Sequence, residues 1–242
     1  MTDTTNAVEI DGLTVRFGGV VAVDNVSLKV GSNELRCVVG PNGAGKSTLF
    51  KALTGQVRPS AGSVRILGRD TGRLERHEIA RLGVGVKTQV PSVFDGLSVG
   101  ESLYVAAKRR PGRNVTGVVD DLLQQLRLGA VRDRTVARLS HGQRQWVELG
   151  MVLATAPALV LLDEPVAGMS EEETQRTVEL LRDVRTGRAI VVVEHDMRFV
   201  RQIADQVTVL HRGAVLCEGQ VDDVLSNSTV RDVYLGRGEH VA

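Results

Sequence analysis

The segment Gly40–Ser47, Gly-Pro-Asn-Gly-Ala-Gly-Lys-Ser, constrains the fold of this 242-residue chain more than any other feature. It matches the phosphate-loop pattern G-x-x-x-x-G-K-[ST], in which a strand enters a glycine-rich turn and a helix leaves it. The apolar run Leu35–Val39 precedes the turn, and a helical pattern over Lys46–Leu53 follows it. Backbone N–H groups of such a turn and the positive end of its helix attract phosphate. The sequence therefore predicts a site for a nucleotide phosphate.

Each position of the loop has an expected task. Lys46 should reach the β- and γ-phosphates, and the Ser47 hydroxyl should bind Mg²⁺. Nucleotide contacts are predicted along the whole loop, at Gly40, Asn42, Gly43, Ala44, Gly45, Lys46, Ser47 and Thr48. The motif alone does not distinguish an ATPase from a GTPase or a kinase. Motifs elsewhere in the chain are needed to choose among these classes.

Short apolar runs rich in β-branched residues predict strands along the chain. Val8–Phe17 and Val26–Val30 alternate between apolar and polar residues, which is typical of antiparallel strands. Ala158–Leu162 and Ala189–Val193 are continuously apolar, as parallel strands buried on both faces are. Helical patterns lie between the runs, at Lys46–Leu53, Ser98–Lys108, Val115–Leu126, Gln143–Ala154, Glu171–Val184 and Met197–Ala204. The alternation favours an α/β fold.

A single domain over residues 1–242 accounts for this organisation. Residues from about 91 to 156 hold several helical patterns and no convincing strand, so they predict a helical subdomain inserted in the fold. The flanking parts, about 1–90 and 157–242, are expected to form the nucleotide-binding core and an antiparallel β subdomain.

The run Ala158–Leu162 leads into two adjacent acids, Asp163 and Glu164. An Asp at the carboxyl end of a parallel strand can face Mg²⁺, directly or through water. The adjacent Glu can orient and polarise a water for in-line attack on a phosphate. The presence of Glu164, rather than Gln or Ser, predicts hydrolysis rather than binding alone.

Three further polar motifs follow predicted strands or precede a predicted helix. Gln89 follows the strand-like segment Val84–Thr88, and His195 follows the apolar run Ile190–Val193. Leu139-Ser-His-Gly-Gln143 comes just before a helix, where a Ser cap and a helix N-terminus can bind an anion. Taken singly, a surface Gln, a structural His and a helix cap are all common.

Two aromatic residues have competing interpretations. The Phe17 ring has a face on which a flat ring could stack, although a buried strand Phe is the rival interpretation. Trp146 lies inside the helix that follows Ser140, and packing in the core explains it better than contact with a substrate.

In this order the phosphate loop, Gln89, the Ser140 motif, Asp163-Glu164 and His195 resemble an ATP-binding-cassette (ABC) ATPase of a transporter, over almost the whole chain. The resemblance implies the P-loop nucleotide-binding fold of that family, with an antiparallel β subdomain and a helical subdomain. It implies ATP and Mg²⁺ as ligands.

The resemblance also assigns roles to single residues. It makes Glu164, His195 and Gln89 catalytic, with His195 at the γ-phosphate and Gln89 at the metal or the attacking water. Ser47, Gln89 and Asp163 hold Mg²⁺, and Phe17 stacks on adenine.

The motif around Ser140 corresponds to the family signature, usually L-S-G-G-Q, and carries His141 in place of a glycine. The family's usual S-A-L-D segment is here Val166-Ala-Gly-Met169, which puts an Asp-mediated contact between two sites in doubt. The segments Leu139–Trp146, Asp163–Ser170, Val193–Met197 and Thr88–Phe94 resemble the ATPases of bacterial urea importers, within the hydrophobic amino acid, amide and urea uptake group.

In the family, two cassettes dimerise head to tail around ATP. Ser140, His141, Gly142 and Gln143 are therefore expected to act on the partner's nucleotide. The implied partners are transmembrane permease subunits, a second cassette that is either non-identical or a copy of this chain, and, indirectly, a solute-binding protein outside the cell. No apolar run is long enough to span a bilayer, so a peripheral place on the cytoplasmic face of the cell membrane is expected.

Alternatives remain for the solute and for the class. Within the family, a branched-chain amino acid importer and a lipopolysaccharide exporter are rivals to urea. A soluble cassette protein acting on DNA or the ribosome is disfavoured by a net charge of +1 and the lack of a heptad run, so no nucleic-acid partner is expected. Glu164 and His195 argue against a nucleotide-binding regulator that does not hydrolyse.

Overall fold

The computed structural model describes residues 6–90, 92–109 and 114–235. The strands are β1 Asn6–Phe17, β2 Val20–Gly31, β3 Leu35–Val39, β4 Ala61–Ile66, β5 Arg69–Asp70, β6 Val84–Lys87, β7 Leu159–Asp163, β8 Ala189–Val193, β9 Gln206–His211 and β10 Ala214–Gly219. The α-helices are α1 Lys46–Leu53, α2 Arg76–Arg81, α3 Val99–Ala107, α4 Val115–Gln125, α5 His141–Ala154, α6 Glu171–Val184, α7 Met197–Ile203, α8 Val221–Ser226 and α9 Ser228–Leu235. Short 3-10 turns span Gly129–Val131 and Val136–Arg138.

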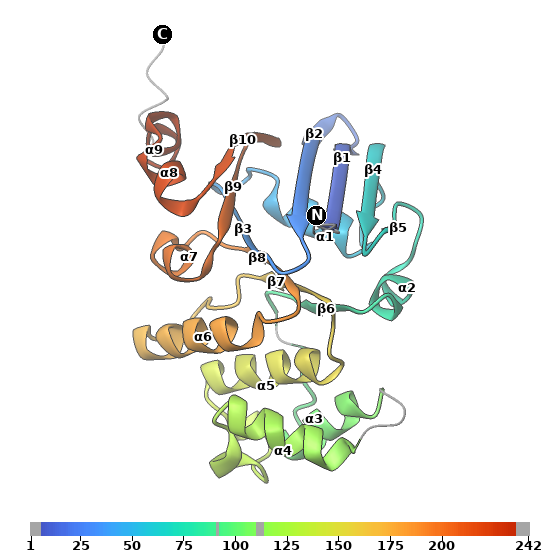
Figure 1. Cartoon of the computed structure of the whole chain (residues 1–242), viewed down its shortest axis with the longest axis vertical. Coiled ribbons are helices and arrows are strands. Elements are labelled where there is room, and N and C mark those ends of the chain that lie inside the picture. Colours follow the sequence, from blue (N-terminus) through green and yellow to red (C-terminus); the bar gives the residue numbers. More distant parts are fainter. Residues whose placement is uncertain (1–5, 91, 110–113, 236–242) are drawn as a thin grey trace, which may run out of the picture.

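Two sheets organise the chain (Figure 1). One has four strands in the order β2-β1-β4-β5 and is antiparallel. The other has six strands in the order β10-β9-β3-β8-β7-β6. Its strands run parallel from β9 to β6, and β10 pairs antiparallel to β9. The predicted α/β fold is confirmed.

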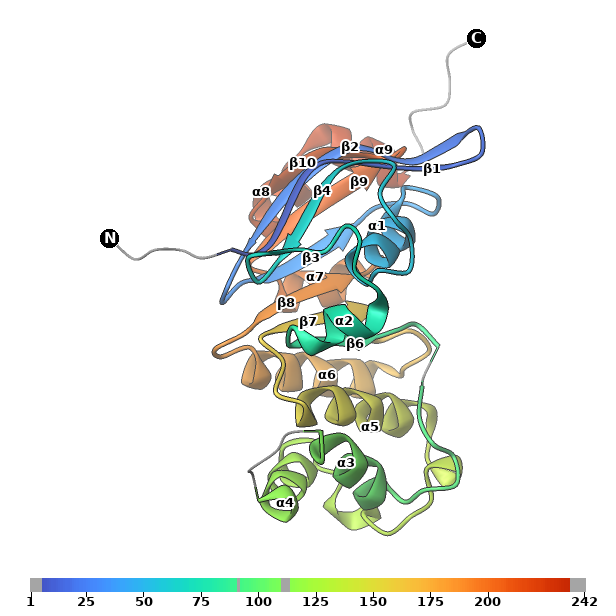
Figure 2. The same ribbon diagram turned by 90° about the vertical axis from the view of Figure 1, so that its right-hand side faces the viewer.

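The central strands β3, β8 and β7 of the six-stranded sheet are buried on both faces, which explains their continuously apolar sequences. Alternate residues of β8 face opposite ways: Ile190 and Val192 join one core cluster, and Ala189, Val191 and Val193 the other. The first cluster includes residues of α3 to α9, and the second includes residues of α1, α2 and the four-stranded sheet. Figure 2 shows α1 between the two sheets, and α5 with α3 and α4 at the other end of the molecule.

The described residues of the predicted helical subdomain form helices and turns, with a single isolated bridge between Ser98 and Thr135. The capping-box pattern, Ser followed three residues later by Glu or Gln, begins three helices. Ser98 pairs with Glu101 at α3, Ser140 with Gln143 at α5, and Ser170 with Glu173 at α6. The subdomain boundaries themselves stay a prediction.

The predicted bounds agree best where the sequence pattern is continuous. The helices over Lys46–Leu53 and Glu171–Val184 and the strand Ala189–Val193 have the predicted bounds. Strands β4, β5, β9 and β10 and the short helices α2, α8 and α9 have no counterpart among the predicted elements. Among the described residues, no helix is long and apolar enough to cross a bilayer.

Candidate active site

The parallel strands bring the predicted polar residues to one edge of the sheet. Strands β3, β8, β7 and β6 are neighbours in that order. Their carboxyl ends lead, respectively, into the phosphate loop, His195, the Asp163-Glu164 pair and Gln89. Carboxyl ends of adjacent parallel strands meet at one edge, which is where ligands bind in open α/β sheets.

Two glycines of the phosphate loop are required by close backbone approach. A Cβ on Gly40 would overlap the carbonyl oxygen of Leu210, and one on Gly45 would lie 2.5 Å from the carbonyl oxygen of Ala22. Gly45 also has a φ of 103°, in the region that disfavours side chains. The loop is therefore held between β9 and β2, and its tight path leads directly into α1.

Lys46 opens α1 and is 7% exposed. Its Nζ donates to the carbonyl oxygens of Gly40, at 2.6 Å, and Pro41, at 3.0 Å. Burial lowers the pKa of Lys46, and the nearby carboxylates of Glu164, Asp163 and Glu194 oppose this. The loop thus folds around a partly desolvated cation at a helix N-terminus, which is the charge an incoming phosphate requires.

Glu164 lies between the other two predicted catalytic residues. Gln89 Nε2 donates to Glu164 Oε2 at 2.7 Å, and His195 Nδ1 lies 3.4 Å from Glu164 Oε1. The Glu164 backbone has a φ of 45°, which is uncommon for a residue with a side chain. Its N–H donates to Val193 O at 2.9 Å, so β8 holds this conformation.

Partly or fully buried carboxyl groups lie at the site. Burial, followed by the neighbouring Glu164 carboxylate, raises the pKa of Asp163, while three lysines oppose the shift. Burial also raises the pKa of Glu194, which is 1% exposed and accepts from the backbone N–H of His195 and Asp196. Such a concentration of negative charge favours binding of a cation beside the loop.

The donors available for Mg²⁺ are oxygens, which suit this hard cation. The exposed Ser47 hydroxyl lies in the first turn of α1, Asp163 ends β7, and the Gln89 amide follows β6. No group of three or more His, Cys, Asp or Glu among the described residues could hold a metal. Mg²⁺ commonly takes one or two protein ligands together with phosphate oxygens and waters, and the oxygens of Ser47, Asp163 and Gln89 fit that role.

The two aromatic residues differ in burial. Phe17, at the end of β1, is 50% exposed, which excludes the buried-core alternative for it. Its hairpin continues into β2, whose Ala22 packs on Gly45 of the loop. Trp146 is buried, donates to Thr177 Oγ1 at 3.0 Å and lies under the Arg176 guanidinium, so it belongs to the packing between α5 and α6.

The predicted signature begins α5. The Ser140 side chain accepts from Gln143 N at 3.2 Å, and Gln143 Oε1 accepts from Ser140 N at 3.1 Å. The Ser140 hydroxyl lies 3.4 Å from Glu173 Oε1, and a Cβ on Gly142 would overlap the same carboxylate. The His141 ring contacts Ala167 O at 3.0 Å.

The structure thus gathers only part of the predicted set. Gly40, Lys46, Asp163, Glu164, Gln89 and His195 lie along one sheet edge, whereas the described contacts of Ser140–Gln143 lead to α6 and to Ala167. Within the described part of the chain, no hydrogen bond joins the signature to the phosphate loop of the same chain. The signature is positioned away from its own loop.

The sequence did not indicate a buried ion pair next to Gln89. Lys87 Nζ, at the end of β6, lies 3.7 Å from Glu148 Oε2 of α5, and both side chains are buried. Glu148 Oε1 also accepts from Ser92 N at 2.9 Å. Burial lowers the pKa of Lys87 and raises that of Glu148, so desolvation outweighs their attraction. The pair joins both sides of the Gln89 turn to α5, and no sequence spacing would have indicated it.

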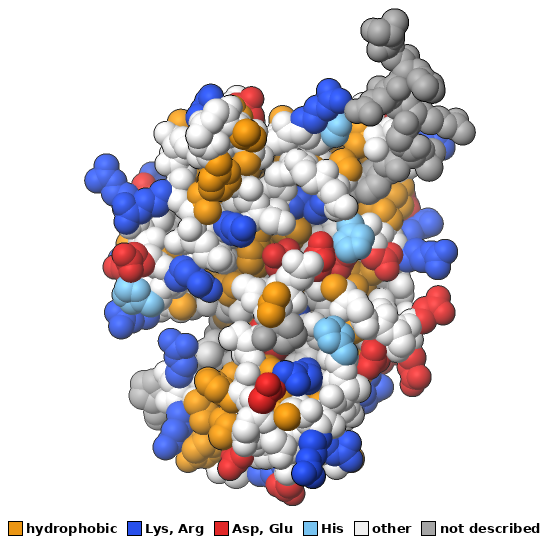
Figure 3. All heavy atoms as spheres, turned by 180° about the vertical axis from the view of Figure 1, so that it is seen from behind, with side chains coloured by type: hydrophobic (Ala, Val, Ile, Leu, Met, Phe, Trp, Pro, Cys, Tyr) orange, Lys and Arg blue, Asp and Glu red, His pale blue; other side chains and the backbone are white. Residues whose placement is uncertain are grey.

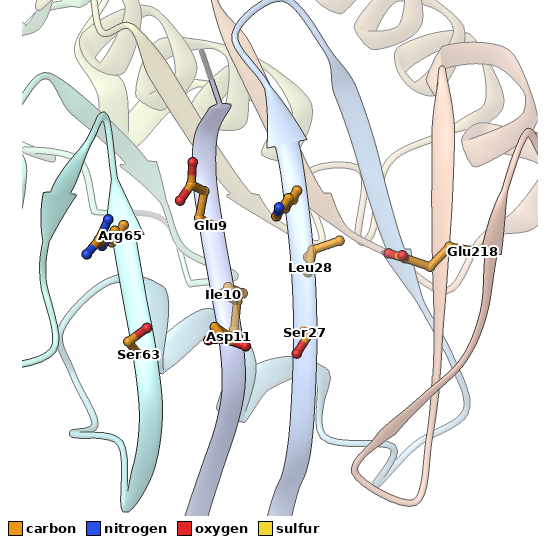
Figure 4. A pocket seen from close by; sticks show the side chains of 9 residues that line it. Glu9, Ile10, Asp11, Ser27, Leu28, Ser63, Arg65 and Glu218 are labelled. Carbon is orange, nitrogen blue, oxygen red and sulfur yellow. The ribbon is translucent and has the colours of Figure 1, made fainter. Parts of the chain in front are cut away.

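The hollow drawn in Figure 4 lies elsewhere. Its 660 Å³ are bounded mainly by the outward side chains of β1, β2 and β4 and by Glu218 of β10. Glu9 lies opposite Lys29 of β2 and Arg65 of β4 in the strand register, so its cross-strand neighbours carry the opposite charge. None of the predicted site residues lines the hollow. We place the chemistry at the sheet edge, where the reactive groups meet.

Comparisons with known proteins agree with this geometry. The family model described as ABC transporter matches residues 23–167. The chain is 34% identical to the high-affinity branched-chain amino acid transport ATP-binding protein BraF of Pseudomonas aeruginosa, covering 94% of this chain and 97% of BraF. It is 36% identical to the lipopolysaccharide export system ATP-binding protein LptB of Acidithiobacillus ferridurans, over 89% and 91% of the two chains.

A solved structure supports the same conclusion. The crystal structure of the ADP conformation of MJ1267, an ATP-binding cassette of an ABC transporter, superposes with a TM-score of 0.85. The sequences are 27% identical, and the match covers 96% of this chain and all of that one.

Proposed function

This chain belongs to the ABC transporter family, and we propose that it is the ATP-hydrolysing subunit of an importer for branched-chain amino acids. The observation that carries the ATP-hydrolysing part of the proposal is the meeting of Gln89, Glu164 and His195 beside the phosphate loop. A carboxylate, an amide and an imidazole at that place can position a water and sense a γ-phosphate.

Binding of ATP begins with Lys46. Its ammonium exchanges the carbonyl oxygens of Gly40 and Pro41 for β- and γ-phosphate oxygens, which form stronger charge-assisted bonds. The backbone N–H groups of Gly43, Ala44 and Gly45, with those of Ser47 and Thr48 at the start of α1, complete the phosphate cradle. The exposed Phe17 ring stacks on adenine.

Glu164 acts on the attacking water. With Gln89 turned towards the water and His195 towards the γ-phosphate, the Glu164 carboxylate is free to accept a hydrogen bond from the water and to take its proton. The water oxygen then bonds to the γ-phosphorus, the bond to the ADP oxygen breaks, and ADP and phosphate result.

Ser47, Asp163 and Gln89 are the residues that would hold Mg²⁺. When bound, Mg²⁺ neutralises charge on the β- and γ-phosphate oxygens. Asp163 carries a pKa raised by burial and by Glu164, so its carboxylate gains from a cation nearby.

Two cassettes complete each site. Since Ser140, His141, Gly142 and Gln143 face α6 and the 166–169 segment rather than their own phosphate loop, we assign them to the nucleotide of a partner cassette. That partner is a second, non-identical ATPase or a copy of this chain. ATP favours the closed pair and ADP does not, so hydrolysis reopens it.

The closing motion reaches a permease through the helical region. Exposed apolar side chains lie on it or next to it, at Val90, Phe94, Tyr104 and Val105. Figure 3 shows a hydrophobic cluster at the lower left, on the part of the molecule formed by α3 and α4. A contiguous exposed apolar patch of this kind fits a protein–protein contact. The chain would then sit at the cytoplasmic face of the membrane, with a solute-binding protein supplying the permease from outside.

The solute is inferred from relatives and from motifs. Matches to proteins named for branched-chain amino acid transport, at 34% and 32% identity and over 94% of this chain, favour that solute over the urea predicted from the motifs. Urea or a short amide remains the second candidate, because Leu139–Trp146 and Asp163–Ser170 resemble urea importer ATPases. Lipopolysaccharide export, the role that LptB is named for, is a third.

The test is uptake in the source cell after Glu164→Gln replaces the natural residue. Radiolabelled leucine, urea and a short amide are compared, with Glu172→Gln on the exposed face of α6 as the matched control. Loss of leucine uptake alone supports the proposal, and loss of urea or amide uptake alone reassigns the solute. If all three solutes enter normally, import is wrong, and export or a soluble role replaces it.

A further inference from the structure

Two departures from the family pattern contact each other in the structure. His141 replaces a glycine of the signature, and Val166–Met169 replaces the usual S-A-L-D segment. Nε2 of His141 lies 3.0 Å from the carbonyl oxygen of Ala167. Helices α5 and α6, which follow these two segments, lie side by side in both ribbon views (Figures 1 and 2).

Gly168 makes room for this contact. Its φ is 74°, and a Cβ there would lie 3.2 Å from His141 Nε2 and 3.5 Å from Cδ2. The shorter of these distances is tighter than ordinary van der Waals contact, so a side chain at position 168 would press on the imidazole. The glycine of one segment and the histidine of the other are therefore complementary.

The hydrogen-bond partners specify the ring's protonation. A backbone carbonyl can only accept, so the 3.0 Å contact with Ala167 requires a proton on Nε2. The amide nitrogen Nε2 of Gln145, whose side chain is 1% exposed, lies 3.2 Å from the same ring nitrogen. Two N–H donors cannot bond to each other, so a proton on His141 Nε2 requires the Gln145 amide to be flipped. The flip brings to the ring the amide oxygen, which is otherwise buried without a hydrogen-bond partner. Gln145 then provides the ring with a second polar neighbour besides the carbonyl.

The contact continues to the reacting centre through the backbone. Ala167 N donates to Glu164 O at 3.2 Å, and Glu164 is the residue held by Gln89 and His195. Two hydrogen bonds therefore connect the signature of this subunit with the backbone of its own Glu164.

We propose that His141 is a positioning residue that couples this subunit's signature to its own Glu164 through Ala167. When the signature engages the partner's nucleotide, the 166–169 segment and Glu164 move with it, so each site reports its state to the other. This rests on the proposed function, because it takes Ser140–Gln143 to act on the partner's ATP.

The kinetic test compares His141→Gln with His141→Leu in the full-length chain. Glutamine carries its Nε2 the same number of bonds from the backbone as imidazole does, so it can still donate to Ala167 O, whereas leucine cannot. We expect kcat of His141→Leu to lie about fivefold below that of His141→Gln, whereas any lost contact with the partner's ATP lowers both variants alike. Equal kcat values for the two variants would overturn the proposal.

A structural control uses a matched glycine. Gly187 has a φ of 75°, and a Cβ added there would meet no other atom within 4 Å. Gly187→Ala therefore carries the same backbone cost as Gly168→Ala without the imidazole. Gly168→Ala should lower the melting temperature more than Gly187→Ala does, and the difference should vanish when each is combined with His141→Gly. A difference that persists without His141 contradicts the contact.

A spectroscopic measurement separates this proposal from the function on which it rests. In the ¹⁵N-histidine-labelled chain, the His141 ring, assigned by its loss in His141→Gly, should carry its proton on Nε2. The Nδ1-protonated tautomer would overturn the proposal even if ATP is hydrolysed. Absence of ATP hydrolysis would instead refute the proposed function, and the tautomer and melting temperatures would still test the contact.

Discussion

The phosphate loop and the signature each begin a helix, α1 and α5, but the two helix starts differ. The N-cap of α1 is Gly45, which has no side chain, so the first N–H groups of that helix keep no side-chain cap. The start of α5 is closed by the Ser140–Gln143 capping box, and the Glu173 carboxylate lies beside it. The first start is open to an anion and has its own cation, Lys46.

The difference between the two helix starts indicates that the phosphate loop binds the nucleotide and the signature closes the pair. An uncapped helix start with a buried lysine can bind a nucleotide in a single chain. A capped start beside a carboxylate of the same chain meets a phosphate only when a partner brings one and Glu173 gives way. Nucleotide affinity should therefore depend on the loop, and closure of the pair on the signature.

The largest expected effect tests that division directly. Lys46→Ala should weaken ATP binding by the single chain about 10- to 100-fold, because a charge-assisted contact to phosphate is lost. Ser140→Ala, the matched change at the other helix start, should leave the affinity of the single chain unaltered. Calorimetric titration with ATP measures both, and unchanged affinity in Lys46→Ala would mean that the loop is misidentified.

The next effect concerns the charges buried behind the loop. Because burial raises the folded-state pKa of Glu194, the folded chain holds that proton more tightly than the unfolded chain does. The stabilisation is present below the ordinary pKa of a glutamate and is lost as the pH rises through the raised value. Glu194→Gln should therefore stabilise the chain at neutral pH, by about 1–2 kcal/mol.

Denaturant unfolding across the acidic to neutral range measures this effect. Glu172→Gln, in the exposed first turn of α6, serves as the control and should not stabilise the chain, because a negative charge is favourable at a helix N-terminus. If Glu194→Gln destabilises the chain at neutral pH, hydrogen bonds compensate the ionised carboxylate. The claim that the buried charge of Glu194 destabilises the folded chain would then be wrong.

A smaller effect is expected at Phe17, the residue proposed to stack on adenine. Phe17→Ala should weaken ATP binding by about 0.5–1.5 kcal/mol through loss of an aromatic stack. Val20→Ala, at the exposed cross-strand neighbour of Phe17, provides the control for the hairpin. No change in affinity would remove Phe17 from the binding site.

The smallest expected effect is on pair formation, through Glu173 beside the signature at the start of α5. Glu173→Gln removes a charge beside the start of α5 and keeps the side-chain oxygen that caps α6. We expect the ATP-dependent pair to form about two- to fivefold more readily, since a charge near a helix terminus is worth about 0.3–1 kcal/mol. Sedimentation of the chain in the Glu164→Gln background measures pair formation, and weaker pairing would give Glu173 a supporting role instead.

Elements can be predicted where local pattern and packing agree. The start of α1 follows from the loop motif, and β8 from an unbroken apolar run. Strand β4 escapes prediction because most of its residues are not fully buried and its partner β1 is far away in the chain. The β9–β10 hairpin is not predicted either, although Val207–Leu210 of β9 is largely apolar. Its second strand, β10, is only partly buried and shows no clear alternation of apolar and polar residues.

For the site, contiguous motifs are the predictable part. The loop, the acid pair, Gln89, the signature and His195 can all be chosen from sequence, and the roles proposed for them await the experiments above. The pairs Lys87–Glu148 and His141–Ala167 join residues far apart in the chain, and each partner alone is an ordinary residue.

The amino-acid sequence alone specifies the phosphate loop, because a strand, a turn of small residues and a helix start are consecutive, and backbone N–H groups supply the chemistry. The meeting of Gln89, Glu164 and His195 depends instead on the strand order β3-β8-β7-β6, which long-range packing of two buried sheet faces selects. The same packing sets α5 against α6, and so directs the signature to the 166–169 segment and away from its own loop. Consecutive residues therefore determine the conformation of the phosphate loop. Burial of apolar surface between distant elements determines which side chains lie beside it.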